Sequence, residues 1–419
     1  MLSVFDLISI LLVITAVFAW INHRLIRLPH TIGLLVVGLG ASLLLIAVDF
    51  AVPNTGLYEN LTSFIRQIDF RSAVLDGMLA FLLFAGAMHV NLARLRSRAG
   101  AVGVMATIGV LISTAIVGGG FYVTANWTGL PMTLGWALVF GALISPTDPV
   151  AVLSTLKAVK VPETLETDMS GESLFNDGVG VVVFTAMLAI AAGSGSGGEP
   201  VGPMRVAELF FVEALGGAAL GLVAGYIAYR SMRAIDDYPI EVLTSLALVA
   251  GTYALADHLH MSGPIAVVVA GLLIGNRGPH DAFSDLTQRY MFGFWQLVDE
   301  VLNTILFLLI GLEVLVLRFD LSFAWAALLA IPLVFVGRLA SVAAPVFFLH
   351  RRQPFVAGTI PVLTWGGLRG GISIALALSI PETPEKSVIL AATYAVVLFT
   401  IIVQGLTLKS LVRRVVREA

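Results

Sequence analysis

Cysteine is absent from this chain of 419 residues, and charged residues are scarce. The absence of cysteine excludes disulfides, thiolate metal sites and a cysteine nucleophile. Asp, Glu, Lys and Arg together make up 12% of the residues, and a soluble domain carries about twice that fraction. No basic patch or cluster of stacking aromatic residues indicates a nucleic-acid partner. The composition therefore argues against a soluble protein.

Long apolar runs recur along the whole chain, and 58% of its residues are hydrophobic. A helix that crosses a bilayer needs about 20 mainly apolar residues. We therefore predict an all-α polytopic membrane protein with thirteen spans. The first run lacks a preceding basic segment and a small-residue cleavage site, so we expect it to be a retained helix. The predicted spans are approximately 3–21, 31–50, 72–91, 100–124, 133–156, 168–192, 206–229, 239–256, 262–276, 291–317, 321–349, 355–380 and 387–408.

The loops between these spans are short, and their basic residues are unevenly distributed. With the N-terminus outside, seventeen Lys and Arg residues fall on the inner side and five on the outer side. Basic residues concentrate on the cytoplasmic side of membrane proteins. We therefore predict a multi-pass protein of the plasma or inner membrane, with its C-terminus in the cytoplasm. The remaining two, Arg338 and Arg369, fall inside predicted helices.

The chain has the organisation of two halves joined by a linker. The run Gly193–Pro203 is rich in glycine and serine and is predicted to be an outer linker. We expect one transmembrane domain over 1–419, with a first repeat at about 1–192, a linker helix at about 206–229 and a second repeat at about 239–413. The fifth and twelfth spans are interrupted at corresponding positions. Paired interruptions indicate inverted six-helix repeats with a binding site at mid-membrane.

The fifth span is interrupted by the sequence ISPTDPV. Pro146 and Pro149 remove two backbone donors, so the helix should break there. The freed carbonyls and the Thr147 hydroxyl then become oxygen ligands for a cation. Asp148 lies near the start of the second half-helix, where a negative charge is favoured. The alternative is a proline kink with a capping aspartate, which we disfavour because a carboxylate is costly at membrane depth.

A second polar motif, GESLFNDG, lies at the start of the long apolar part of the sixth span. Ser173 and Asp177 are four residues apart and share one helix ridge, and Glu172 and Asn176 share the next. These side chains should face the protein interior or a water-filled cavity, because facing lipid is costly. Burial disfavours the charged form of Asp177, so this carboxylate can exchange a proton for a metal cation. The alternative is a capping cluster at the cytoplasmic surface.

Together, TDP at Thr147–Pro149 and GESLFNDG at Gly171–Gly178 resemble the motifs of monovalent cation/proton antiporters of the NhaP and NHE type. The runs Gly366–Gly371 and Asn303–Gly311 resemble that family too, and the resemblance covers essentially the whole membrane region. It implies an NhaA-like fold with a six-helix core domain, two crossed discontinuous helices, elevator-like alternating access and a homodimer. It also implies a transporter that exchanges Na⁺ for H⁺ and needs no cofactor, and not an enzyme.

By the same resemblance, Asp177 binds the proton and the cation alternately. Asp148, Thr147 and Ser173 are implied to complete the Na⁺ site with it, and Asn176 to shape that site. Electrogenic relatives carry a second aspartate at the position of Asn176. The Asn–Asp form found here accompanies electroneutral exchange, so the resemblance implies one cation for each proton.

Glu172, Arg338 and Arg369 are expected to balance charge inside the membrane. An arginine at membrane depth needs a partner or water. The resemblance suggests that Glu172 pairs with an arginine of the second half, for which we favour Arg338 over Arg369. Arg369 is alternatively expected to neutralise the carbonyl ends of its own broken helix. Snorkelling to the membrane interface is a further explanation for either arginine.

One position departs from the family pattern. Many relatives carry a glutamate in the third span, within a pattern like FLLFEGG, where this chain reads FLLFAGA with Ala85. The lost carboxylate weakens the inference of sodium selectivity, so Li⁺ and K⁺ stay open. Asp299 and Glu300 of the tenth span either line an inner funnel or lie at a solvated helix end. All seven histidines fall in loops or at helix edges, where interface anchoring is favoured over a pH response.

Two other functional classes remain as alternatives. A carrier of another small solute on a related scaffold would need a roomier polar pocket than these motifs indicate. Asp148 and Asp177 could form the dyad of an intramembrane aspartyl protease, but the Tyr-Asp and Gly-x-Gly-Asp signatures are absent. We therefore favour an antiporter. The chain ends about ten residues after the last predicted span, without the long tail of animal relatives, and this favours a prokaryotic source.

Overall fold

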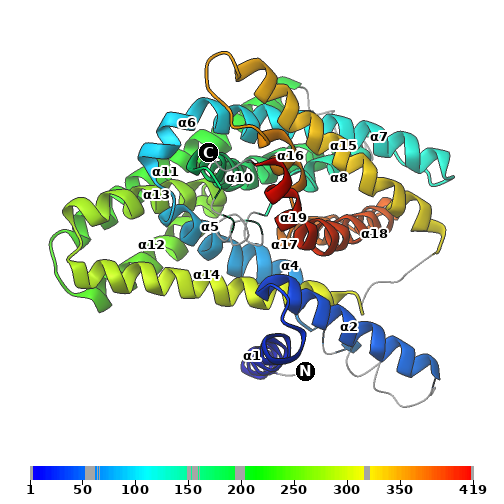
Figure 1. The fold of residues 1–419 in the computed structure, drawn as a ribbon, viewed down its shortest axis with the longest axis horizontal. Helices are drawn as coiled ribbons and strands as arrows, with labels where there is room; N and C mark the ends of the chain where they lie inside the picture. The colour runs from blue at the N-terminus through cyan, green and yellow to red at the C-terminus, as the bar shows by residue number, and fades with distance from the viewer. Residues whose placement is uncertain are drawn as a thin grey trace.

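The computed structural model describes residues 3–51, 62–63, 65, 67–148, 152, 159, 161–193, 203–315 and 321–416. This part of the chain contains helices and no β-strand (Figure 1). Ten of its helical segments are long and apolar enough to cross a bilayer. The prediction of an all-α, multi-pass membrane protein is confirmed.

The described part of the first half of the chain contains four long helical segments, one short helix and then a fifth long one. The helices and π-helical turns are α1 (Val4–Ile21), η1 (Asn22–Ile26), α2 (His30–Ala51), α4 (Phe70–Ser72), η2 (Ala73–Met78), α5 (Leu79–Met88), α6 (Leu92–Val104), η3 (Met105–Gly109), α7 (Val110–Trp127), α8 (Leu134–Leu143) and α10 (Glu163–Gly193). Part of the predicted fifth span, 133–156, lies outside the described residues. The fourth segment begins at Leu92 and not near residue 100, because α6 extends the apolar span through a basic stretch.

The described part of the second half also consists of helices, and α11 lies at the position predicted for the linker helix. Its elements are α11 (Pro203–Met232), α12 (Tyr238–His258), α13 (Gly263–Asp281), α14 (Asp285–Glu313), η4 (Leu321–Phe323), α15 (Ala324–Leu349), α16 (Thr359–Trp365), α17 (Gly371–Ser379), α18 (Pro384–Phe399), η5 (Thr400–Gln404) and α19 (Gly405–Val415). Capping residues fix several of these starts. The Asp237 side chain accepts a hydrogen bond from the backbone N–H of Ile240, and the Ser262 hydroxyl accepts one from that of Ile265.

The helices pack in two groups. We call α6–α8, α10 and α15–α19 the first group, and α5 with α11–α14 the second. Helices α1 and α2 pack on α14, and Figure 1 shows them below it. Close approach in the second group depends on small residues, since a Cβ at Gly221 of α11 would overlap the carbonyl oxygen of Ala266 in α13. The space between the two groups contains the candidate site.

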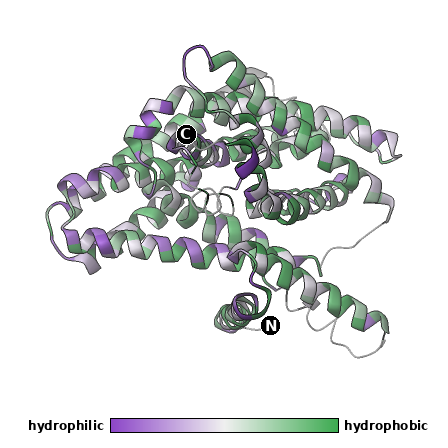
Figure 2. Cartoon of the chain, in the orientation of Figure 1, coloured by the Kyte–Doolittle hydropathy of each residue, from purple (hydrophilic) through white to green (hydrophobic). Residues whose placement is uncertain are grey.

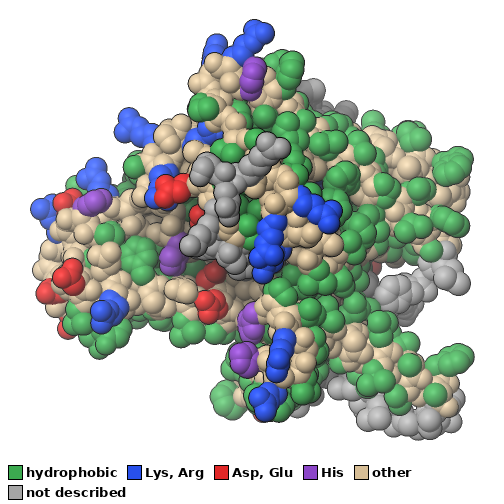
Figure 3. Space-filling view, in the orientation of Figure 1, with side chains coloured by type: hydrophobic (Ala, Val, Ile, Leu, Met, Phe, Trp, Pro, Cys, Tyr) green, Lys and Arg blue, Asp and Glu red, His purple; other side chains and the backbone are tan. Residues whose placement is uncertain are grey.

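The outer surface of the helices is strongly apolar. Large side chains such as Phe50 and Phe347 are 91% and 75% exposed. Figure 2 shows α7, α15 and α18 as predominantly hydrophobic, and hydrophobic side chains cover the same part of the molecule in Figure 3. Such a surface is stable only in contact with lipid or a partner chain, as expected of membrane-spanning helices.

Candidate functional site

The end of helix α8 and the break between α16 and α17 meet inside the first group. Helix α8 ends at Leu143 and is followed by a non-helical stretch at 145–148, which contains Pro146, whereas Pro149, the second proline of the predicted break, lies outside the described residues. Helix α16 ends at Trp365 and α17 begins at Gly371, with a non-helical stretch between them that contains the predicted glycine-rich break. We call these two stretches the first and second interruptions.

Each interruption satisfies backbone groups of the other. The backbone N–H of Asp148 donates to the carbonyl oxygen of Leu368 at 2.8 Å. Arg369 donates from Nη1 to the carbonyl oxygens of Ser145 at 2.5 Å and Pro146 at 2.9 Å. Buried backbone groups without partners are costly, and here the partners come from the opposite half of the chain. Arg369 thus neutralises carbonyls of the first interruption and not, as one alternative had it, those of its own helix.

The crossing also requires a residue without a side chain at one point. A Cβ at Gly370 would overlap the side-chain carboxylate of Asp148. Glycine therefore allows the second interruption to approach Asp148 closely. This contact explains one glycine of the GGLRGG run in physical terms.

Helix α10 holds the first interruption through three side-chain contacts. Asn176 donates from Nδ2 to the Thr147 hydroxyl at 2.8 Å, and its Oδ1 accepts from the Thr147 backbone N–H at 3.3 Å. The Ser173 hydroxyl donates to the carbonyl oxygen of Thr147. The predicted site residues of the two motifs are therefore in direct contact. Asn176 fixes the position of Thr147, because it pairs with both the backbone and the side chain of that residue.

Asp177 lies one residue further along α10 and differs from its neighbours. Its side chain is buried, at 7% exposed, and its Oδ1 atom has no hydrogen-bond donor among the described residues. A buried carboxyl group without a partner is costly as the charged form. Such a group gains most from binding a proton or a cation, which is the property expected of an ion carrier.

A cavity of about 580 Å³ reaches Asp177, Asp148, Thr147 and Ser173. It lies between the two helix groups, because α5 and α14 form its opposite wall. The wall includes four polar residues of α14, namely Gln296, Asp299, Glu300 and Asn303. This arrangement favours the funnel interpretation of Asp299 and Glu300 over the solvated helix end.

The donor atoms available in this cavity suit an alkali cation. Within the described residues, no group of three His, Cys, Asp or Glu side chains is arranged to hold a metal ion. Carboxylates and hydroxyls of Asp177, Asp148, Thr147 and Ser173 are the oxygen atoms at hand. Oxygen atoms at broken helices are the usual ligands of transported Na⁺. Ala85 also lines this cavity, so the family carboxylate it replaces would lie in the same wall.

Glu172 lies on α10 five residues before Asp177 and has a full set of partners. Arg338 of α15 pairs with it in two parallel contacts, from Nη1 to Oε1 and from Nη2 to Oε2, the latter at 2.9 Å. The same guanidinium donates from Nε and Nη2 to the carbonyl oxygen of Leu363. Both members are buried, and a bidentate pair is the strongest arrangement of these groups. The partner of Glu172 is thus Arg338 and not Arg369.

A second buried ion pair lies at the start of α10 and was missed in the sequence. Arg98 of α6 contacts Asp168 from Nε at 2.7 Å and from Nη2 at 2.5 Å. Its Nη1 donates to the carbonyl oxygen of Pro354, and the guanidinium lies 4.7 Å from the centre of the Phe355 ring. The sequence analysis places Arg98 in an inner loop, because the predicted span begins at residue 100. The signal was its helical spacing from the buried Leu95.

Comparisons with known proteins agree with this architecture. The family model described as sodium/hydrogen exchanger, transmembrane, matches residues 12–414. The Na⁺/H⁺ antiporter NhaP of Pseudomonas aeruginosa is 46% identical over 415 residues, which cover 98% of this chain and 96% of that protein. The Na⁺/H⁺ antiporter NhaH of Halobacillus dabanensis is 36% identical over 402 residues, 93% of each chain.

The solved structure of the sodium proton antiporter MjNhaP1 from Methanocaldococcus jannaschii at pH 8 has the same fold. It superposes with a TM-score of 0.74 at 20% identity and covers 99% of both chains. The resemblance found in the sequence motifs is therefore confirmed over nearly the full length. The chain belongs to the transmembrane sodium/hydrogen exchanger family and is a transporter, not an enzyme.

Proposed function

We propose that this exchanger binds Na⁺ and H⁺ alternately at Asp177 and exchanges one for one. The observation that carries the proposal is the buried Asp177 carboxyl group, which reaches a cavity and has an oxygen without a hydrogen-bond donor among the described residues. The Na⁺/H⁺ activity named for the relatives in Pseudomonas aeruginosa and Halobacillus dabanensis supports the choice of ions.

The two loaded states follow from the chemistry of one carboxyl group. With a proton bound, Asp177 is neutral and its burial costs little. Without the proton, its charge is balanced by Na⁺, with Asp148, Thr147 and Ser173 supplying further oxygens. One group cannot hold both ions, so the two compete. Asn176 cannot take up a second proton, and this supports electroneutral exchange.

Alternating access in this proposal is a movement of the first helix group against the second. The interruptions and Asp177 belong to the first group, whereas α5 and α14 form the facing wall. The two interruptions at corresponding places support inverted six-helix repeats with crossed discontinuous helices, and these repeats together with the linker helix make the thirteen spans of this proposal. A homodimer in the plasma or inner membrane, with an outer N-terminus and a cytoplasmic C-terminus, completes the proposal.

Reconstitution of the purified protein in liposomes that contain a pH dye tests this function. Addition of Na⁺ outside acid-loaded liposomes should raise the internal pH, and protein-free liposomes are the control. Li⁺ and K⁺ are added in turn, because Ala85 leaves the choice of cation open. Absence of a pH change with all three cations would overturn the proposal.

The stoichiometry is tested in the same liposomes with the membrane voltage set by K⁺ and valinomycin. The Na⁺ gradient at which exchange stops should not depend on the voltage. A strong voltage dependence would contradict one-for-one exchange and would make Asp148 the next candidate for a second proton site.

A further inference from the structure

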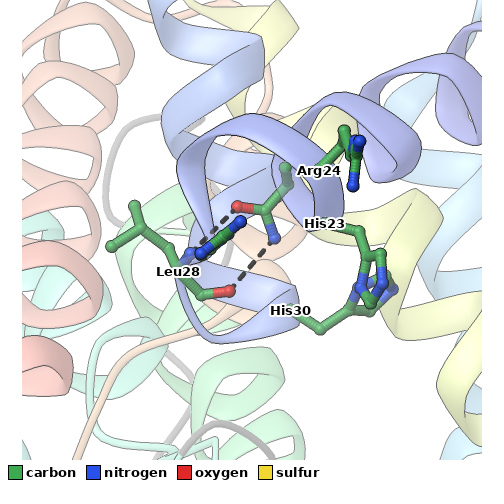
Figure 4. Close-up of a pocket in the computed structure, with 6 residues that line it drawn as sticks. His23, Arg24, Leu28 and His30 are labelled. Atoms are coloured by element: carbon green, nitrogen blue, oxygen red, sulfur yellow. Dashed lines mark hydrogen bonds between the residues drawn. The ribbon is translucent and has the colours of Figure 1, made fainter.

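A second cavity, separate from the candidate ion site, lies where α1 continues through η1 toward α2. Its volume is about 540 Å³ (Figure 4). The described residues that line it, which we call the basic pocket, are Asn22, His23, Arg24, Arg27, Leu28 and His30. Four of these six side chains are basic and none is acidic. The pocket shares no lining residue with the ion cavity, so it requires a separate explanation.

The turn that carries the basic pocket is held in a defined shape by Asn22. This buried side chain donates to the carbonyl oxygen of Leu28 at 3.1 Å and accepts from the Leu28 backbone N–H at 3.3 Å (Figure 4). The backbone carbonyl oxygen of Asn22 accepts a hydrogen bond from the Arg27 backbone N–H at 2.6 Å. A Cβ at Gly33 would overlap the Asn22 amide. The pocket is therefore a built feature and not a loosely folded loop.

Arg27 adopts a backbone conformation in this turn that is unusual for an arginine. Its φ of +62° lies in the left-handed region, which an arginine adopts rarely. Asn or Gly would adopt this conformation more readily. The presence of arginine at this position indicates that the charge itself is useful.

No carboxylate of the described residues pairs with the arginines of the basic pocket. Arg24 and Arg27 are exposed, and neither forms an ion pair or a side-chain hydrogen bond within the described residues. The buried Arg98 and Arg338 each contact a carboxylate. Figure 3 shows basic and histidine side chains gathered over the turn between α1 and α2. A concave surface with this charge attracts an anion.

The position of the basic pocket relative to the membrane indicates which kind of anion can reach it. It lies between two candidate membrane spans, Phe5–Ile26 and His30–Ala51, and so at the level of the lipid headgroups. Trp20, Leu25 and Ile26 beside it are large apolar side chains that are 63%, 69% and 43% exposed. Basic residues next to exposed apolar ones at the end of a span are typical of sites for anionic lipids.

We propose that the basic pocket binds the phosphate of an anionic phospholipid. Arg24 and Arg27 contact the phosphate, and the first free N–H groups of α2 add partial positive charge. The acyl chains lie along the exposed apolar side chains of α1 and η1. A free phosphate ion would use the same charges but would leave the apolar surface uncovered, so this surface favours a lipid.

The basic pocket is connected to the wall of the ion cavity. His30 contacts the Thr304 hydroxyl of α14 from Nε2 at 2.9 Å, and that hydroxyl donates to the carbonyl oxygen of Glu300 at 2.5 Å. Glu300 itself lines the ion cavity. A bound lipid therefore stabilises the packing of α2 on α14, whichever cation the protein transports.

Native mass spectrometry of the purified protein tests the proposal. The protein is titrated with phosphatidylglycerol or with phosphatidylcholine of the same chain length. The test variant is Arg24→Gln with Arg27→Asn, because asparagine tolerates the left-handed backbone. The control variant is Arg351→Gln with Arg352→Gln, which removes two neighbouring exposed arginines at the end of α15. Neither variant should melt at a lower temperature than the wild type without lipid.

The wild type and the control variant should bind phosphatidylglycerol more tightly than phosphatidylcholine. The test variant should lose about thirtyfold in affinity for phosphatidylglycerol, as expected for two interfacial arginines, and little for phosphatidylcholine. An equal loss in both variants would overturn the proposal, as would unchanged binding in the test variant. Displacement of the lipid by inorganic phosphate would reassign the pocket to a soluble anion.

Discussion

Two regions of α10, separated by little more than one turn, differ in the surroundings of their buried carboxylates, which are paired with arginine in one region and not in the other. At the start of the helix, Asp168 and Glu172 are both fully engaged, with Arg98 and Arg338 respectively. At its centre, Asp177 has an oxygen without a hydrogen-bond donor in the described structure. The comparison separates two roles for one chemical group. A paired carboxylate fixes neighbouring helices in place, whereas an unpaired one is available to a mobile ion.

The paired region connects α10 to helices from both halves of the chain. Arg98 belongs to α6 and Arg338 to α15. Helix α10 is thus anchored at one end on two sides, while its centre faces the cavity. The anchoring keeps Asp177 in register with the two interruptions, since Ser173 and Asn176 lie on the same helix and contact Thr147.

The largest effect is expected at the unpaired end, for Asp177→Asn. Asparagine keeps the shape of the side chain but cannot take up and release a proton, so exchange in proteoliposomes should fall to the level of empty liposomes. The melting temperature in detergent should stay equal or rise, because the cost of burying a charge is removed. Substantial residual exchange would assign the carrier role to another residue and would contradict the idea that the unpaired carboxylate of α10 is the ion carrier.

At the paired end, Glu172→Gln should lower the free energy of unfolding but leave the protein able to bind ions. It leaves Arg338 buried without a counter-charge, a loss of about 3–5 kcal/mol, and the melting temperature should fall strongly. Adding Arg338→Gln should restore part of this loss, because it removes both charges. The matched control, Glu172→Gln with Arg369→Gln, should not.

The Glu172 prediction has two clear ways to fail. Rescue by the Arg369 control alone would show that the contact seen between Glu172 and Arg338 is not the important one. A Glu172→Gln protein as stable as the wild type would remove the structural role, and Glu172 would then need testing in the liposome assay as an ion site.

Arg98→Gln should have a smaller effect of the same kind, near the lower end at about 3 kcal/mol. The reason for the difference is that a buried carboxylate left without its partner can take up a proton, whereas a buried arginine stays charged. The measurement is again the melting temperature, with Asp168→Asn added to relieve the remaining charge. A larger drop than that of Glu172→Gln would reverse the order of the two pairs.

The smallest effect is expected for Asn176→Ala, which lies between the two regions. It removes the two hydrogen bonds to Thr147, for a loss of about 1–3 kcal/mol. Exchange should persist, but the Na⁺ concentration at half-maximal rate should rise, because Thr147 is held less firmly. Complete loss of exchange would give Asn176 a direct role in ion binding. The separation of α10 into a structural region and an ion-binding residue would then not hold.

Much of this arrangement follows from local features of the sequence. Apolar run length predicts the spans, the spacing of Ser173, Asn176 and Asp177 predicts a shared cavity face, and the prolines beside Thr147 predict the first break. These inferences depend on residues within a few positions of one another. The identification of Arg338 as the partner of Glu172 needed the family resemblance, since 166 residues separate the two.

Two features could not be predicted from the sequence, namely the pair of Arg98 with Asp168 and the contacts of Arg369. They depend on contacts between distant residues and on the exact ends of helices. Arg98 was assigned to a loop because a basic stretch hides the start of α6, and its pair with Asp168 was missed as a result. The reach of Arg369 across to Ser145 and Pro146 depends on how the two interruptions cross. No local pattern encodes that crossing, although the glycine at 370 allows it.

The crossing of the interruptions has a consequence for the biosynthesis of the protein. The carbonyl groups of Ser145 and Pro146 are completed by Arg369, which the ribosome adds more than 200 residues later. Until then, the first interruption enters the membrane with polar backbone groups that lack their final partners. The nascent first half must therefore keep these groups in contact with water, the translocation machinery or a chaperone. A chain that stops before the second interruption should insert but remain a target for membrane proteases.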